Sequence, residues 1–295
     1  MTYYKTAYSF QFLSFRGIAC FAKGSLWRLL GIQFLFSFII AAVFVWFINH
    51  AWIPVIDESI EKMPNKGEIS LGSLNWPTGS SVHVQGPEGE PFMSLDIEPS
   101  GITNVIESVD LVLAFDSQRL FLGSSLGFGL LVVPYPLNIE IPFNKTELKP
   151  WWGARSHLIL FCFGFLVSII LILSWSFLGF LYMFPVKIFS GNRLSFRGAW
   201  QLASAAHMPG AILMSFGILM YGLKQIELVH FAFLWLIHLI FPWFYLIFSP
   251  FFVPKHNPKI DYNNKKNAKS DQITNPFNKI SASKKKSDNP FQNLI

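Results

Sequence analysis

The sequence predicts an α-helical membrane protein with four transmembrane helices and a small β-rich extracytoplasmic domain inserted between helices 1 and 2. Three observations lead to this fold class: a shortage of charge, four long uncharged runs, and basic residues on alternate sides of those runs. Charged residues make up 14% of the 295 residues and hydrophobic residues 52%, whereas about 25% of a typical soluble domain is charged. The charges are too few to cover a soluble surface, so a soluble cytosolic enzyme is nearly excluded.

Each of the four uncharged runs exceeds the roughly 18 residues that a membrane-spanning helix requires. Backbone polar groups cannot stay unpaired in hydrocarbon, so each run should be helical. The predicted transmembrane helices are residues 29–48, 158–184, 198–223 and 228–254. The first run is too long for the core of a secretory signal, and no small-residue cleavage pattern follows it at 49–52, so we interpret it as a retained anchor.

The distribution of charge predicts the orientation. Residues 1–28 carry 4 basic and no acidic residues, residues 49–157 carry 13 acidic and 6 basic residues (net −7), and residues 255–295 carry 9 basic and 3 acidic residues. The loop between the second and third runs is also basic. The positive-inside rule then places both termini in the cytoplasm of a plasma or bacterial inner membrane. Because orientation explains the basic residues, they indicate no nucleic-acid partner.

The segment 49–157 is long enough to fold by itself. Apolar and polar residues alternate at 93–98 and again at 137–141, and two continuous apolar runs lie at 111–115 and 120–122. Alternation is typical of half-buried strands and short apolar runs of buried ones, so we expect a β-rich domain. A short helix is expected near 104–108, and residues 54–63 should continue the first helix out of the membrane.

The two terminal segments are expected to lie on the cytoplasmic side. The Phe-rich N-terminal segment 1–28 is interpreted as interfacial, with a helix on the membrane surface within 8–27. The tail 255–295 is Lys-, Asn- and Ser-rich without apolar periodicity, which predicts disorder. Its Lys284–Lys286 cluster is a candidate for contact with anionic lipid, although we favour a solvated basic tail. The Asn-Pro-Phe triplets at 275–277 and 289–291 resemble adaptor ligands, but we favour a coincidence of composition.

No pattern in the sequence indicates catalysis, a metal or a cofactor. The segment 123–127 matches the G-x-S-x-G of a nucleophile elbow, but an apolar strand-like run follows where a helix is needed, so we expect a glycine-rich turn. His83 and the carboxylates of the same domain lack metal-ligand spacing and are interpreted as solvated surface residues. Cys20 and Cys162 both lie outside that domain, so no disulfide framework is expected. We therefore expect a protein that is not an enzyme.

A polar face on the third and fourth predicted helices is the most unusual feature. At 100° per residue, polar side chains of each helix fall on one side. The members of this intramembrane polar face are Ser204, His207, Ser215, Glu227, His230, His238 and Tyr245. One interpretation is a path for a proton or small ligand between the two helices. The other, which we favour, is interhelical hydrogen bonding with close packing of small residues. Breaks or bends are expected at Pro209-Gly210 and at Pro242.

The third predicted helix carries a family resemblance. Leu194–Arg197, Trp200–Ala206 and Pro209 resemble the start of the corresponding helix in an uncharacterised bacterial multi-span family that looks like a distant relative of the Yip-type proteins. Ser94–Ile97 followed by Gly101 is similar to a strand-and-turn element of the same family. The resemblance implies one anchor, an outer β domain and a three-helix membrane block. It implies no catalytic residues.

Two functional hypotheses follow from the sequence. The first is a membrane protein that senses a signal, acts as a scaffold, or binds an unknown protein partner through the outer domain or the tail. The second is a small permease, or an accessory subunit of a transporter, that uses the polar faces of helices 3 and 4. The lipid bilayer is the only partner that composition itself implies.

Overall fold

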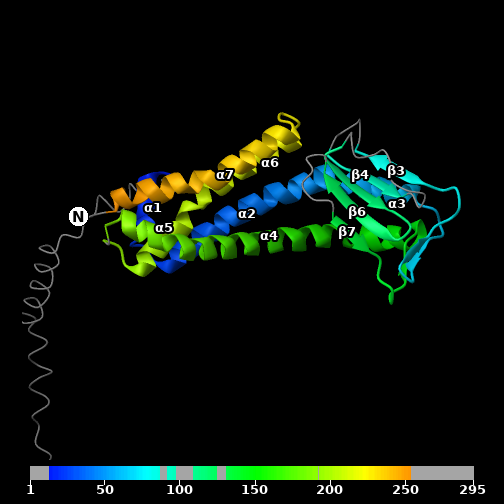
Figure 1. The fold of residues 1–295 in the computed structure, drawn as a ribbon, viewed down its shortest axis with the longest axis horizontal. Helices are drawn as coiled ribbons and strands as arrows, with labels where there is room; N and C mark the ends of the chain where they lie inside the picture. Colours follow the sequence, from blue (N-terminus) through cyan, green and yellow to red (C-terminus); the bar gives the residue numbers. More distant parts are fainter. Residues whose placement is uncertain (1–12, 87–91, 98–108, 125–130, 192, 254–295) are drawn as a thin grey trace, which may run out of the picture. The chain divides into compact units, whose positions relative to one another are not determined.

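The computed structural model describes residues 13–86, 92–97, 109–124, 131–191 and 193–253. In these ranges the chain is mostly helical, with four long apolar helices and two small β-sheets (Figure 1). The predicted helix near 104–108, the tail and residues 1–12 lie outside the described ranges. The four apolar helices are long and apolar enough to cross a membrane by length and composition.

The first apolar helix is α2, Leu26–Ala51. Ser25 caps it, because the Ser25 hydroxyl accepts a hydrogen bond from the Arg28 backbone N–H. After Trp52 the chain enters a second helix, α3, Ile53–Lys62, with a proline in its first turn where no donor is lost. The predicted helix at 54–63 is confirmed by α3. Figure 1 shows α2 leading toward the sheets.

The helix α4 returns from the sheets as one continuous element, Lys145–Phe189. Its 45 residues correspond to about 68 Å at about 1.5 Å per residue, more than twice the hydrocarbon thickness of about 30 Å. Asn144 caps its first turn and Pro150 lies near that end. Residues 145–157, expected in the β-rich domain, are therefore helical.

The third apolar segment is divided into α5, Phe196–Ala206, and α6, Met208–Gly222. The break falls at His207, two residues before Pro209, because the proline is accommodated in the first turn of the new helix. The break expected at Pro209-Gly210 is therefore present, but it lies at His207, two residues earlier. In the most apolar window of this segment, 72% of the residues are buried, against 17% for the fourth, so α5 and α6 form the centre of the bundle.

The fourth apolar segment comprises α7, Leu228–Phe248, and a short 3₁₀-helix, η2, Ser249–Phe252. The helix continues through Pro242, which is buried. Near η2 the N-terminal helix α1, Phe15–Phe21, packs with Ile18, Ala19 and Phe21 buried. The helix expected to lie on the membrane surface is thus short and buries one side in the bundle.

The β-rich region contains two sheets (Figure 1). The strands are β1 (Glu68–Ser70), β2 (Ser73–Asn75), β3 (Val82–Gln85), β4 (Ser94–Ile97), β5 (Leu111–Phe115), β6 (Arg119–Ser124), β7 (Leu131–Pro134) and β8 (Ile141–Pro142). The order is β2-β1-β8 in the small sheet and β3-β4-β5-β6-β7 in the large one, where only β4 and β5 are parallel.

Strands were correctly expected at β4, β5 and β6, but two details differ. All four side chains of β4 are buried instead of every second one, because β4 lies inside the five-stranded sheet and α3 packs near it. The alternating residues Leu137 and Ile139 form no strand and are exposed. Only Ile141–Pro142 of that run pairs, with β1.

Candidate functional site

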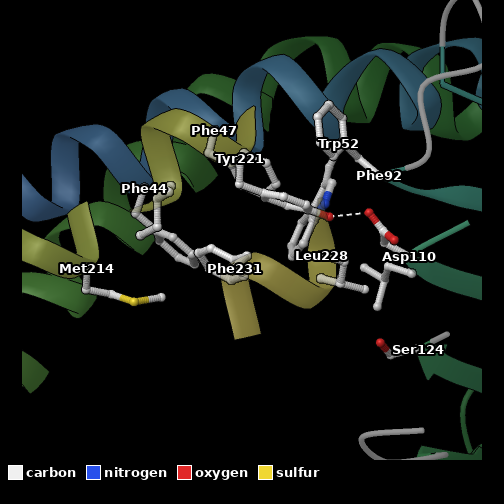
Figure 2. Close-up of a pocket in the computed structure, with 12 residues that line it drawn as sticks. Phe44, Phe47, Trp52, Phe92, Asp110, Ser124, Met214, Tyr221, Leu228 and Phe231 are labelled. Carbon is white, nitrogen blue, oxygen red and sulfur yellow. Dashed lines mark hydrogen bonds between the residues drawn. The ribbon is translucent and has the colours of Figure 1, made fainter. Parts of the chain in front are cut away.

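A cavity of about 270 Å³ lies where the large sheet meets three helices (Figure 2). Most of its lining is aromatic. The aromatic members are Phe44, Phe47, Trp52, Phe92, Tyr221 and Phe231. Aliphatic side chains, a methionine and two polar residues, Asp110 and Ser124, complete the lining. This volume is close to the lower limit of about 300 Å³ for ligand pockets, so the site suits a small molecule.

The aromatic rings are packed against one another. Ring centroids lie 5.5 Å apart for Phe47 and Tyr221, 5.1 Å for Phe92 and Tyr221, and 4.9 Å for Tyr221 and Phe231. Tyr221 is therefore the hub of the cluster. Such edge-to-face and offset pairs fix ring orientations beyond simple area burial, so the aromatic wall is largely preformed.

One polar contact crosses the cavity. The Tyr221 hydroxyl on α6 donates a hydrogen bond to the Asp110 carboxylate, which lies one residue before β5 (Figure 2). Burial raises the pKa of Asp110 above its ordinary value of 3.8, while the hydrogen bond from Tyr221 opposes that shift. The contact links the sheet directly to the bundle, and the carboxyl group is held in an environment that favours its neutral form.

Helical spacing explains how the bundle contributes to this site. Met214, Ile218 and Tyr221 lie at positions i, i+4 and i+7 of α6, and therefore on one side of that helix. Glycine allows the neighbouring helices to approach. A Cβ atom on Gly222 would lie 3.0 Å from the Phe47 ring, and one on Gly217 would lie 2.8 Å from Leu234 of α7.

The predicted polar face is divided by the structure. Ser204 and His207 are buried toward α4: the Ser204 hydroxyl lies against Gly179, and the His207 ring lies 5.5 Å from that of Tyr182. The Ser204 hydroxyl and His207 Nε2 have no hydrogen-bond partner among the described residues. Ser215 donates to the backbone oxygen of Ala211 within its own helix.

The remaining predicted residues lie elsewhere. The side chains of Glu227 and His230 are 85% and 68% exposed, and are 4.0 Å apart near the start of α7. His238 is half-buried and bonds to a backbone oxygen of its own helix. Tyr245 is buried and donates to the Leu13 backbone oxygen at 2.7 Å. The seven residues therefore form no common site.

This division has a geometric cause. The side of α7 that packs inward is marked by Phe231, Leu234, Pro242 and Tyr245. Residue periodicity identifies which positions share a side of a helix, but not which side its neighbours cover. Glu227 also precedes the first helical residue, so the 100° rule did not apply to it.

The β-rich region contains one polar cluster that differs from expectation. His83 and Asp96 face each other on β3 and β4, and His83 Nδ1 is hydrogen-bonded to the Asp96 carboxylate. Asp96 is only 4% exposed and also accepts from the Ser94 hydroxyl at 3.1 Å. The interpretation of Asp96 as a solvated surface residue was wrong. Within the described ranges, no three His, Cys, Asp or Glu side chains gather as metal ligands would.

Sequence reasoning missed the residues that matter most in the cavity. Asp110 stands as a lone carboxylate between Val109 and Leu111, and Tyr221 is a polar group near the end of an apolar helix. The signal available in the sequence was the charge of Asp110 next to an apolar run, which is typical of a partly buried carboxylate. The residues 125–127 of the G-x-S-x-G segment lie outside the described ranges, whereas Ser124 ends β6 and lines the cavity.

The chain matches no protein-family model, no curated protein and no solved structure. The resemblance to Yip-type proteins therefore stays a prediction.

Proposed function

We propose that this chain is a four-span protein of the cell membrane that binds a small apolar ligand between an extracytoplasmic β-rich domain and the helical bundle. In this role it senses the ligand or presents a ligand-dependent surface to a protein partner, and it is not an enzyme. Four long apolar helices support the membrane assignment. So do the large side chains that α4 turns outward, such as Phe161, Leu173 and Phe177, which are exposed as lipid-facing residues should be.

The observation that carries the proposal is the shared cavity. Phe47 and Tyr221 belong to helices, whereas Asp110 and Ser124 belong to the large sheet. A molecule bound here contacts both parts at once. Because a ligand shifts an equilibrium only through different contacts in two states, a site built from two parts is suited to report occupancy as a change in how they meet.

A photoreactive octanol carrying a diazirine provides a direct test. The full-length protein in nanodiscs of phosphatidylglycerol is irradiated with this probe, and labelled peptides are mapped by mass spectrometry. We expect labels on the helices and strands around the cavity. Met214→Trp, which fills the apolar end of the cavity, should reduce this labelling at least ten-fold.

The matched control is Leu166→Trp on α4, where the native side chain is 50% exposed. It adds a similar ring at an outward position and should leave labelling of the cavity unchanged. Equal labelling of the Met214→Trp protein, or labels confined to outward surfaces, would rule out a ligand site in the cavity.

Orientation is tested separately with topology reporters. Fusions after Gly86 should report the extracytoplasmic side, and fusions after Ile295 the cytoplasm, because basic residues dominate the terminal segments. A tail that reports outside would reverse the assignment and place the cavity at the cytoplasmic surface.

A permease or transporter accessory subunit is the second candidate. Its support is the group of buried polar atoms without a described partner, Gln33 Oε1, Ser204 Oγ and His207 Nε2, since polar groups inside a bundle often mark transport paths. Proton-coupled uptake in proteoliposomes that is lost on His207→Phe and kept on His230→Phe would favour this function.

A further inference from the structure

We propose that the ligand of this cavity is a cationic amphiphile, a short hydrocarbon chain that ends in an ammonium group. The ammonium lies beside Asp110 and among the aromatic rings, and the chain extends toward Met214. The inference rests on the proposed function because it uses the same cavity, and it adds the chemical class of the ligand.

The carboxylate provides the first argument. Asp110 is partly buried, its hydrogen bond comes from a neutral phenol, and no ion pair between described residues includes it. Buried carboxylates are usually paired with a cation. The raised pKa of Asp110 is the effect expected when burial is not balanced by a positive charge. An ammonium group supplies that charge.

The aromatic rings provide the second argument. The face of an aromatic ring attracts cations through its quadrupole, and clusters of such rings are suited to quaternary ammonium groups. Phe47, Phe92 and Tyr221 are mutually within 5.6 Å between ring centroids, and Tyr221 is the one that bonds Asp110. The cluster and the carboxylate therefore meet at the same point.

The far end of the cavity differs in chemistry. In Figure 2, Met214 lies at the end of the site away from Asp110, and Phe44 lies on the same side. Described residues there offer apolar surface that suits a hydrocarbon chain. Charge also favours a cation over an anion, because the segment 49–157 carries a net charge of −7, and a field of one sign concentrates ligands of the opposite sign.

Competition against the photoreactive octanol tests the ligand class. Three octyl compounds of matched chain length are compared in phosphatidylglycerol nanodiscs: octyltrimethylammonium, octanol and octyl sulfonate. Half-maximal suppression of cavity labelling should require at least ten-fold less octyltrimethylammonium than octanol, and octyl sulfonate should be the weakest. Tetramethylammonium, which lacks the chain, should compete poorly.

Variants connect this preference to the carboxylate. Asp110→Asn keeps the shape of the side chain and removes its charge. In this variant the concentrations of octyltrimethylammonium and octanol that suppress labelling by half should differ by no more than about three-fold, close to the error with which separate energetic effects add. Glu58→Gln makes the same change in net charge on the exposed face of α3 and should leave the advantage intact.

A second set of nanodiscs tests whether the ammonium group belongs to a lipid or to a free amine. Phosphatidylcholine carries a trimethylammonium group in its headgroup, so the labelling is repeated in nanodiscs that contain it. Reduced labelling that is restored by Asp110→Asn assigns the site to a lipid headgroup, whereas unchanged labelling with competition by soluble octyltrimethylammonium assigns it to a free amine.

Two outcomes separate the two proposals. Labelling of the cavity with no advantage of the ammonium compound, or with an advantage that survives Asp110→Asn, overturns the ligand class and leaves the binding site. Absence of cavity labelling by the octanol probe overturns both.

Discussion

At the end of the bundle that contains α1, small residues bring α5 into direct contact with α1 and α4, whereas at the end next to the sheets aromatic side chains surround a cavity. Gly198 lies so close to α1 that a Cβ atom would come within 2.6 Å of the Ala22 backbone oxygen, and one on Gly179 would come within 1.9 Å of the Ser204 hydroxyl. At the other end, Phe47, Tyr221 and Phe231 surround a cavity.

The two ends of the bundle therefore differ in how much change in side-chain volume they tolerate. Interfaces of small residues in membrane bundles gain their stability from close van der Waals contact, and they tolerate little change in volume. A partly filled site between aromatic rings tolerates added volume and offers a place for a ligand. One bundle therefore contains a close-packed end and an end with a cavity.

The largest expected effect comes from adding one methyl group at the close-packed end. Gly179→Ala places a Cβ atom 1.9 Å from the Ser204 hydroxyl and 2.9 Å from its backbone nitrogen, so rotating the hydroxyl does not relieve the clash. We expect a loss of about 3 kcal/mol in the free energy of unfolding, the upper part of the usual range for overpacking. Unfolding in mixed micelles measures it.

Gly31→Ala is the control, because a Cβ atom there meets nothing within 4 Å. It should not destabilise the protein. Ser204→Gly combined with Gly179→Ala should recover part of the loss, since the two residues are in contact and their effects should not add. Equal effects of Gly179→Ala and Gly31→Ala would contradict the packing described for α4 and α5.

An intermediate effect is expected from pH at the cavity end. The pKa of Asp110 is raised on folding by burial, so its contribution to stability is complete below 3.8 and is lost as the pH rises through the higher folded value. Going from acidic to neutral pH should therefore destabilise the wild type more than Asp110→Asn. Thermal unfolding followed at several pH values gives this difference.

Tyr221→Phe tests whether Asp110 causes this pH dependence of stability. The hydrogen bond from Tyr221 lowers the pKa of Asp110, so its removal should move the loss of stability to higher pH. A shift to lower pH would show that another group controls the titration.

The smallest effect is expected from a single interhelical hydrogen bond near the middle of α2 and α4. The Ser168 hydroxyl on α4 donates to the Ser37 backbone oxygen on α2 at 3.3 Å. Bonds of this kind contribute about 0.6 kcal/mol on average in membrane bundles, so Ser168→Ala should lower the free energy of unfolding by roughly that amount. A loss as large as that of Gly179→Ala would mean that polar contacts, and not packing, hold α2 and α4 together.

The long apolar runs made the helices predictable, and the strands around Leu95 and Leu113 followed from alternation and local apolar character. The ends of the helices were harder to predict from the sequence. α4 begins at Lys145 because Asn144 caps it, although the uncharged run that predicted this helix begins only at residue 158. A break was expected at Pro209-Gly210, but its position at His207 depends on how Pro209 is placed in the first turn of α6, which composition does not determine.

The candidate site could not be predicted in the same way. Tyr221 and Asp110 are separated by 111 positions, and no periodicity joins two residues on different elements. The residues of the expected polar face are separated for a related reason: spacing placed His230 and His238 on one side of the helix, but the neighbouring helices determine that Phe231 and not His230 turns inward. Local patterns identify elements, whereas the contacts between elements decide what forms a site.

The helices that lead into and out of the β-rich region are fastened to each other. Glu61 on α3 forms ion pairs with Lys145 and Lys149 on α4, and Trp152 donates to Asp57 at 2.6 Å. Chain entry and exit therefore lie side by side, as in domains that tolerate insertion into other proteins. This arrangement would let the β-rich region be exchanged as a unit: a bundle that keeps α2 and α4 could carry a different module on the same pair of helices.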